Sequence, residues 1–196
     1  PEAAWGGSDA PRDARLQPLP DAAPPAAWPS CAPEDIALLQ YTGGTTGTPK
    51  GAILTHGNIT AAVEIYRAWR DARSLPPGEQ RVLVALPLFH IVALTAVLLR
   101  QLSEGNLCLL RPRFDAAQWA EDVERHRVTV FSGVPTMWIG ILNLPGIEAR
   151  DLSSLRMCTS GGAPMPFEVQ QKLERLLGTR IGGGWGMTET CPAGTR

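Results

Sequence analysis

Short apolar segments alternate with amphipathic segments from about residue 35 to the end of the chain. The expected strands are Ile36–Tyr41, Val82–Leu86, Leu107–Leu110, Val128–Phe131, Leu155–Thr159 and Arg180–Gly183. They show little alternation of polar and apolar residues, which is typical of strands buried on both faces. The expected helices are Asn58–Ala72, Ile91–Leu102, Asp115–Arg125, Pro135–Leu142 and Pro166–Leu177. This alternation predicts an α/β fold in which helices flank a mostly parallel sheet on both faces.

The first part of the chain has a different composition. Residues 1–34 are rich in proline and alanine and show no hydrophobic period, so we expect a linker or an extended segment there. Residues 35–196 would then form one α/β unit, consistent with 196 residues and a hydrophobic content of 44%.

Charge and composition limit the classes of binding partner and the compartment expected for this chain. The formal net charge of −1 does not favour nucleic acid or an anionic membrane as the main partner, and at most peripheral membrane contact is expected. No apolar run is long enough to span a bilayer, and no signal peptide is visible. Four widely spaced cysteines indicate free thiols in a reducing, cytoplasmic setting, and three scattered histidines do not favour a zinc site.

The segment Tyr41–Gly51 combines glycines, threonines and a lysine. It follows an apolar stretch read as a short buried strand and precedes a helix for which Asn58 would be the N-cap. Such a glycine-rich loop can cradle nucleotide phosphates. The order Pro49-Lys50-Gly51 disfavours a P-loop kinase or NTPase, because the hydroxyl that should follow the lysine is missing. A plain surface turn is the alternative, although Lys50 is one of only two lysines in an arginine-rich chain.

Two further glycine-rich loops follow expected strands. Ser160–Pro164 would let a flat ring approach the backbone, or it is an ordinary strand-to-helix turn. In Gly182–Thr190, Trp185 can stack on a base, Thr188 can donate to a phosphate and Glu189 can bind Mg²⁺. The alternatives are a core aromatic and a solvated carboxylate. Because each loop follows a strand, all would lie at the carboxyl edge of the sheet, where ligands bind in open α/β folds.

The segment Leu86–His90 ends another expected strand. His90 has apolar neighbours in the sequence, so a histidine packed in the core and a histidine beside a ligand both remain open at this point.

Taken in order, these motifs resemble the adenylate-forming superfamily, which includes acyl- and aryl-CoA synthetases, firefly luciferase and peptide-synthetase adenylation domains. Tyr41–Gly51 resembles its phosphate loop, Ser160–Pro164 its adenine-contacting turn, and Gly184–Thr190 its Gly-Tyr-Gly-x-Thr-Glu motif with tryptophan in place of tyrosine. Leu86–Thr95 is most similar to bacterial long- and medium-chain fatty acyl-CoA ligases. The resemblance implies a subdomain of the N-terminal domain of such an enzyme.

The resemblance also implies the reaction. A fatty acid or related carboxylate attacks ATP to give acyl-AMP, and CoA then displaces AMP, with Mg²⁺ required. The implied phosphate contacts are Thr42, Gly44, Thr45, Thr46, Gly47, Thr48 and Lys50. The implied contacts to the AMP part are Gly162, Ala163, Pro164, Gly184, Trp185, Gly186, Met187 and Thr188. The implied catalytic residues are Lys50, His90, Thr188 and Glu189, with Glu189 as the magnesium ligand. Phe131, Val134 and Met137 could line the acyl pocket with His90.

The chain also departs from the family pattern. It lacks the later ribose-binding aspartate, the hinge, the C-terminal domain with its catalytic lysine and the early N-terminal part. We therefore expect the 196-residue chain by itself to form no acyl-CoA and to bind ATP at most weakly, and uncovered apolar surface would favour its self-association. An aryl-CoA ligase, an acyl-AMP ligase that loads a carrier protein, and a non-catalytic nucleotide-binding module remain alternatives.

Overall fold

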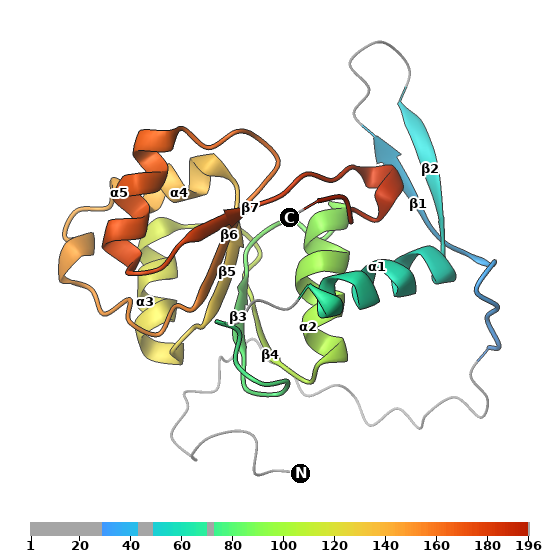
Figure 1. Cartoon of the computed structure of the whole chain (residues 1–196), viewed down its shortest axis with the longest axis horizontal. Coiled ribbons are helices and arrows are strands. Elements are labelled where there is room, and N and C mark those ends of the chain that lie inside the picture. Colours follow the sequence, from blue (N-terminus) through green and yellow to red (C-terminus); the bar gives the residue numbers. More distant parts are fainter. Residues whose placement is uncertain (1–28, 43–48, 70–72, 196) are drawn as a thin grey trace. The chain divides into compact units, whose positions relative to one another are not determined.

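The larger of the two sheets in the described residues has five parallel strands (Figure 1). The structure is a computed structural model that describes residues 29–42, 49–69 and 73–195. The strands, in spatial order, are β4 (Leu107–Leu110), β3 (Arg81–Val84), β5 (Val130–Gly133), β6 (Met157–Ser160) and β7 (Ile181–Gly183). The predicted α/β class with a mostly parallel sheet is confirmed, and the predicted strands after residue 80 lie within a few residues of the observed ones.

Helices cover both faces of this sheet. One face packs against α3 (Ala116–His126), α4 (Pro135–Leu142) and α5 (Phe167–Leu177), and η2 (Val92–Leu99) packs against the other (Figure 1). The strands alternate between the two cores: Leu83 belongs to the first hydrophobic cluster, whereas Val82 and Val84 belong to the second. This period of two is the geometry of a strand buried on both faces.

The alternation along β5 places the side chain of Phe131 on the face of the sheet that packs against α3 and α4. Its side chain is 0% exposed and lies in the first core, with its ring centroid 5.0 Å from that of Trp138 and 5.6 Å from that of Trp119. Met137 packs against the same cluster. The expectation that Phe131 and Met137 line an acyl pocket is therefore wrong. The neighbouring Ser132 points to the opposite face, because successive side chains on a strand alternate.

The first strand does not belong to the parallel sheet. β1 (Ile36–Thr42) pairs antiparallel with β2 (Lys50–Thr55), a strand that the sequence analysis did not predict. The interpretation of β1 as a buried strand is also wrong, because Leu39 and Tyr41 are 57% and 67% exposed. The glycine-rich loop therefore joins two strands of a hairpin rather than a strand and a helix, and its residues 43–48 lie outside the described ranges.

The helix after the hairpin begins earlier than predicted. α1 spans His56–Ala68, and its N-cap is Thr55 rather than Asn58. Thr55 Oγ1 accepts a hydrogen bond from the Asn58 backbone N–H at 3.2 Å, and Asn58 Oδ1 accepts one from the Thr55 N–H at 3.0 Å. This reciprocal pair is a capping box, in which Asn58 takes the third helical position.

The predicted helix Ile91–Leu102 is two elements. Residues Val92–Leu99 form the π-helix η2, and α2 (Arg100–Ser103) continues it. Runs of π-helix are rare and frequently occur at functional sites. In the described ranges, no helix is both long and apolar enough to cross a bilayer.

A buried ion pair ties the end of β4 to α3. Arg111 Nε donates to Asp122 Oδ2 at 2.7 Å, and the Asp122 side chain is only 2% exposed. We expect Arg111→Met to lower the free energy of unfolding by about 3 kcal/mol, because the buried carboxylate loses its counter-ion. Urea unfolding of the chain measures this change. Arg67→Met is the matched control, since Arg67 and its partner Glu64 are exposed by 43% and 59%, and it should leave the urea midpoint unchanged. Equal midpoint shifts for the two variants would contradict the prediction.

Candidate functional site

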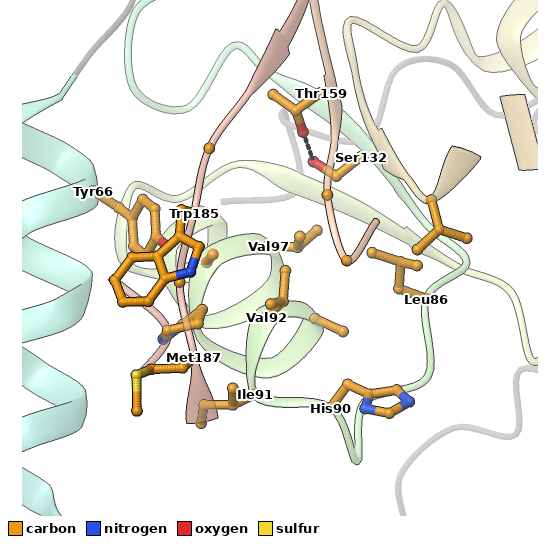
Figure 2. Close-up of a pocket in the computed structure, with 18 of the residues that line it drawn as sticks. Tyr66, Leu86, His90, Ile91, Val92, Val97, Ser132, Thr159, Trp185 and Met187 are labelled. Carbon is orange, nitrogen blue, oxygen red and sulfur yellow. Dashed lines mark hydrogen bonds between the residues drawn. The ribbon is translucent and has the colours of Figure 1, made fainter. Parts of the chain in front are cut away.

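A cavity of about 670 Å³ opens at the carboxyl edge of the parallel sheet. Its lining comes from the ends of β5, β6 and β7, from η2 and α1, from β1, and from the segment after β7. Figure 2 shows several of these side chains around η2. The edge of the sheet predicted for ligand binding is therefore hollow, and residues far apart in the sequence meet there.

One described end of the glycine-rich loop, Thr42, lies at this site, whereas Lys50 at the other end does not line the cavity. Thr42 lines the cavity, and its Oγ1 donates to the backbone oxygen of Lys50 at 3.3 Å. Lys50 is exposed at the start of β2, opposite Thr42 in the hairpin register. Gly44, Thr45, Thr46, Gly47 and Thr48 lie outside the described residues, so their role as phosphate contacts stays a prediction.

In the turn after β6, only some of the residues that were predicted to contact AMP line the cavity. Gly161 and Gly162 line the cavity, and Gly162 has φ of 78°, a conformation that favours glycine. Ala163 and Pro164 are exposed and do not line it. The close backbone approach predicted for a flat ring is therefore available at the two glycines.

The segment after β7 lines the cavity continuously from Gly183 to Glu189. Trp185 keeps 60% of its surface exposed, so one side of its ring system is free to stack on a flat ligand. Its backbone pairs with Thr195 through two hydrogen bonds, of 3.0 and 2.8 Å. The turn η4 (Thr188–Thr190) then places Thr188 and Glu189 at the cavity wall. The interpretation of Trp185 as a core aromatic is wrong.

His90 also lines the cavity, and it is exposed rather than packed in the core. Its ring lies 4.7 Å from that of Phe89. Gln40 Nε2 donates to the Phe89 backbone oxygen at 2.8 Å, which joins the hairpin to the loop that carries His90 (labelled in Figure 2). The interpretation of His90 as a residue packed in the core is therefore wrong, and its position beside a ligand stays a prediction.

The sequence analysis missed several polar residues of the wall. Thr159 Oγ1 donates to Ser132 Oγ at 2.8 Å, the bond drawn in Figure 2, and both residues line the cavity. Ser160 Oγ is buried and makes no hydrogen bond with any residue in the described ranges. Gln101 lines the cavity from α2. Position at a strand end, alternating with a core residue such as Phe131, is the signal that would have found Ser132.

The buried cysteines are poor nucleophiles. Burial raises the pKa of the Cys158 thiol to about 12 and also raises that of Cys191, which follows η4. Both therefore stay protonated at neutral pH, and the thiolate is the reactive form. Neither cysteine is a candidate for covalent chemistry at this site.

The single carboxylate in the cavity wall fits a magnesium ion that is coordinated mainly by the phosphates of a bound nucleotide. Within the described ranges, no group of three or more His, Cys, Asp or Glu side chains could hold a metal ion. Glu189 supplies one carboxylate to the cavity wall. Mg²⁺ is commonly bound by one or two carboxylates together with substrate phosphates, and the donors present match that pattern.

Comparison with known proteins gives a consistent result. The family model described as AMP-binding enzyme matches residues 5–196. The chain is 43% identical over 165 residues to a long-chain-fatty-acid–CoA ligase of Bacillus subtilis, which covers 84% of this chain and 29% of the relative. It is also 43% identical over 160 residues to a feruloyl-CoA synthase of Amycolatopsis sp, with 81% of this chain and 31% of the relative covered.

A solved structure shares the fold. The inhibitor-bound N-terminal domain of FACL13 from Mycobacterium tuberculosis superposes with a TM-score of 0.75 at 29% identity, covering 86% of this chain and 41% of that one. The chain thus spans less than a third of the two curated relatives' length and less than half of this structure.

Proposed function

Because this chain belongs to the AMP-binding enzyme family, we propose that it carries the nucleotide and acid sites of an AMP-forming acyl-CoA ligase. The proposed substrates are a fatty carboxylate, ATP and CoA. One observation carries the choice of a fatty acid: the cavity beside the glycine-rich motifs continues along apolar side chains of η2 and the sheet. These side chains are Leu86, Val92, Val97, Val130 and Met157.

The proposed chemistry has two steps. A carboxylate oxygen of the acid attacks the α-phosphorus of ATP, and the bond from that phosphorus to pyrophosphate breaks. The sulfur of CoA then attacks the acyl carbon, and the carbon–oxygen bond to AMP breaks. Both steps gain most from positioning and from compensation of charge.

The proposal assigns a role to five residues in or beside the cavity. The exposed ring of Trp185 stacks on adenine, and the hydroxyl of Thr188 donates to the α-phosphate. We assign Lys50, exposed at the start of β2, to the outer phosphates, and His90, which lines the cavity, to the acid. Glu189 would hold magnesium, which when bound compensates the phosphate charge.

The chain contains only two lysines, and this allows a matched test of the proposed phosphate contact. Lys50→Ala should lower kcat/KM for ATP by about 10- to 100-fold, the effect of losing one charge-assisted hydrogen bond. Pyrophosphate release with saturating acid measures it. Lys172→Ala removes the other lysine of the chain, which is exposed on α5 away from the cavity, and should leave kcat/KM unchanged. Equal effects of the two substitutions would contradict the assignment of Lys50 to phosphate binding.

An aryl acid is the second candidate, because the feruloyl-CoA synthase is as similar to this chain as the fatty acid ligase. The test is formation of acyl-CoA from octanoate, dodecanoate, benzoate and ferulate, with the protein as its gene encodes it, including any sequence that flanks these residues. Turnover of the two aliphatic acids supports the proposal, and turnover of ferulate alone supports the second candidate. Failure of all four acids would count against ligase activity.

A further inference from the structure

The inner end of the cavity is polar, although the η2 side chains that lead to it are apolar. Along η2 and α2, the lining residues recur in pairs on one helix face, and the last pair is Arg100 and Gln101. From the sheet, the lining runs from Gly133 at the carboxyl end of β5 to Val130 at its start. The lining therefore reaches the first residues of β5 and β6, Val130 and Met157, beyond side chains around η2 such as Val92 and Val97 (labelled in Figure 2).

The amide of Gln101 is held in one orientation. Asn106 Oδ1 accepts hydrogen bonds from the backbone N–H groups of Gly78 and Gln80, at 2.9 and 3.2 Å. Asn106 Nδ2 must therefore point the other way, and it donates to Gln101 Oε1 at 2.7 Å and to Glu104 Oε2 at 3.1 Å. Because Gln101 accepts through its oxygen, its Nε2 and the two N–H donors on that atom face away from Asn106.

No residue in the described ranges accepts a hydrogen bond from these donors. Gln101 is 1% exposed, and its Nε2 makes no hydrogen bond with any residue that the structure describes. The nearly buried Nε2 therefore has room for an acceptor from the cavity, and a ligand oxygen there would satisfy donors that no described residue pairs.

The charges next to Gln101 select the kind of acceptor. Arg100 Nε lies 3.9 Å from Glu104 Oε1, and the two side chains are 5% and 7% exposed. The charges of this buried pair compensate each other. A second carboxylate brought to this depth would add a buried negative charge, whereas a neutral oxygen would not.

We propose that Gln101 Nε2 binds a neutral oxygen atom at the end of the substrate farthest from its carboxylate, as in an ω-hydroxy fatty acid. This inference rests on the proposed function, and it narrows the fatty carboxylate to one with an oxygen at its far end. The lining runs along η2 and α2 from Ile91 to Gln101, which suits an aliphatic chain of medium length.

The test compares ω-hydroxy acids of 8, 10, 12 and 14 carbons with the unsubstituted acids of the same lengths. At the matching length, the hydroxy acid should have a kcat/KM about three- to tenfold higher, the effect of one hydrogen bond. Gln101→Met, which keeps the length of the side chain and removes the donors, should lower this ratio to one or below. Val97→Ala, an apolar residue of the same wall, should keep a ratio above one. Each ratio is independent of the fraction of enzyme that is folded.

The outcomes separate this inference from the proposed function. If no acid of either series forms acyl-CoA, the proposed function fails. If unsubstituted acids react as well as hydroxy acids at every length, or if Gln101→Met keeps the wild-type ratio, only this inference is overturned. A preference for the corresponding dicarboxylic acids would also overturn it, because it requires a neutral oxygen. Should Gln101→Met fail to fold, the wild-type ratio alone decides: a peak at one chain length supports the inference and a flat profile overturns it.

Discussion

Glu189→Gln should lower the rate of acyl-AMP formation by about 100-fold or more. Glutamine keeps the size of the side chain at the cavity wall and one oxygen, but it removes the negative charge that would hold Mg²⁺ beside the phosphates. Pyrophosphate release at saturating acid and ATP measures the loss. A rise in the magnesium concentration needed for half-maximal rate should accompany it, which a purely structural role for Glu189 would not produce.

Glu168→Gln is the control for this prediction. Glu168 lies in the first turn of α5, is exposed, and does not line the cavity. Its substitution should leave both the rate and the magnesium dependence unchanged. A Glu189→Gln enzyme with a rate within threefold of the wild type, at unchanged magnesium dependence, would refute the assignment of Glu189.

Gly186→Ala should lower kcat/KM for ATP by about 100-fold, because displacing a positioned group by about 1 Å costs that much. A methyl group at Gly186 would overlap the backbone carbonyl of Pro192, which cannot rotate away as a side chain can. Either residues 192–195 separate from Trp185, or the segment that carries Trp185 and Thr188 moves. The two backbone hydrogen bonds between Trp185 and Thr195 would break in the first case.

The expected signature is a loss of ATP use without a loss of the fold, because the parallel sheet and both of its cores lie outside this segment. Thermal unfolding and ATP kinetics together measure it. Gly140→Ala is the control, since a methyl group there makes ordinary contact with Phe114, with a nearest distance of 3.7 Å. If Gly186→Ala retained wild-type kcat/KM for ATP, the close contact between Gly186 and the backbone of Pro192 would have no role in nucleotide binding.

The parallel sheet could be predicted because its signal is local. Leu107–Leu110 and Pro135–Leu142 were predicted with the bounds that β4 and α4 have in the structure. Unbroken apolar runs separated by amphipathic helices have few other solutions than a sheet covered on both faces. The predicted position of the glycine loops at the carboxyl edge followed from the same argument.

The errors occur where the same local signal has two solutions. The apolar run of β1 fits a buried strand, yet β1 pairs with β2 in a hairpin whose Leu39 and Ile53 are largely exposed. Likewise, Val92–Leu99 is apolar except for Thr95, so its sequence carries no periodicity that distinguishes a π-helix from an α-helix. Hydrogen-bond register in such a segment depends on what packs around it.

The sequence by itself determined the fold class and the kinds of chemical group available, because these depend on residue types and on their order along the chain. Glycines after strands, a lysine and threonines near Tyr41, and the Trp185–Glu189 segment were all recognisable in this way. Only the tertiary structure decided which side chains meet in the cavity. Ser132 lines it while Phe131 does not, and Gln101 lines it with an amide whose oxygen accepts a hydrogen bond from Asn106. Such contacts depend on strand register and on hydrogen bonds between elements, and neither is encoded in the local pattern of the chain.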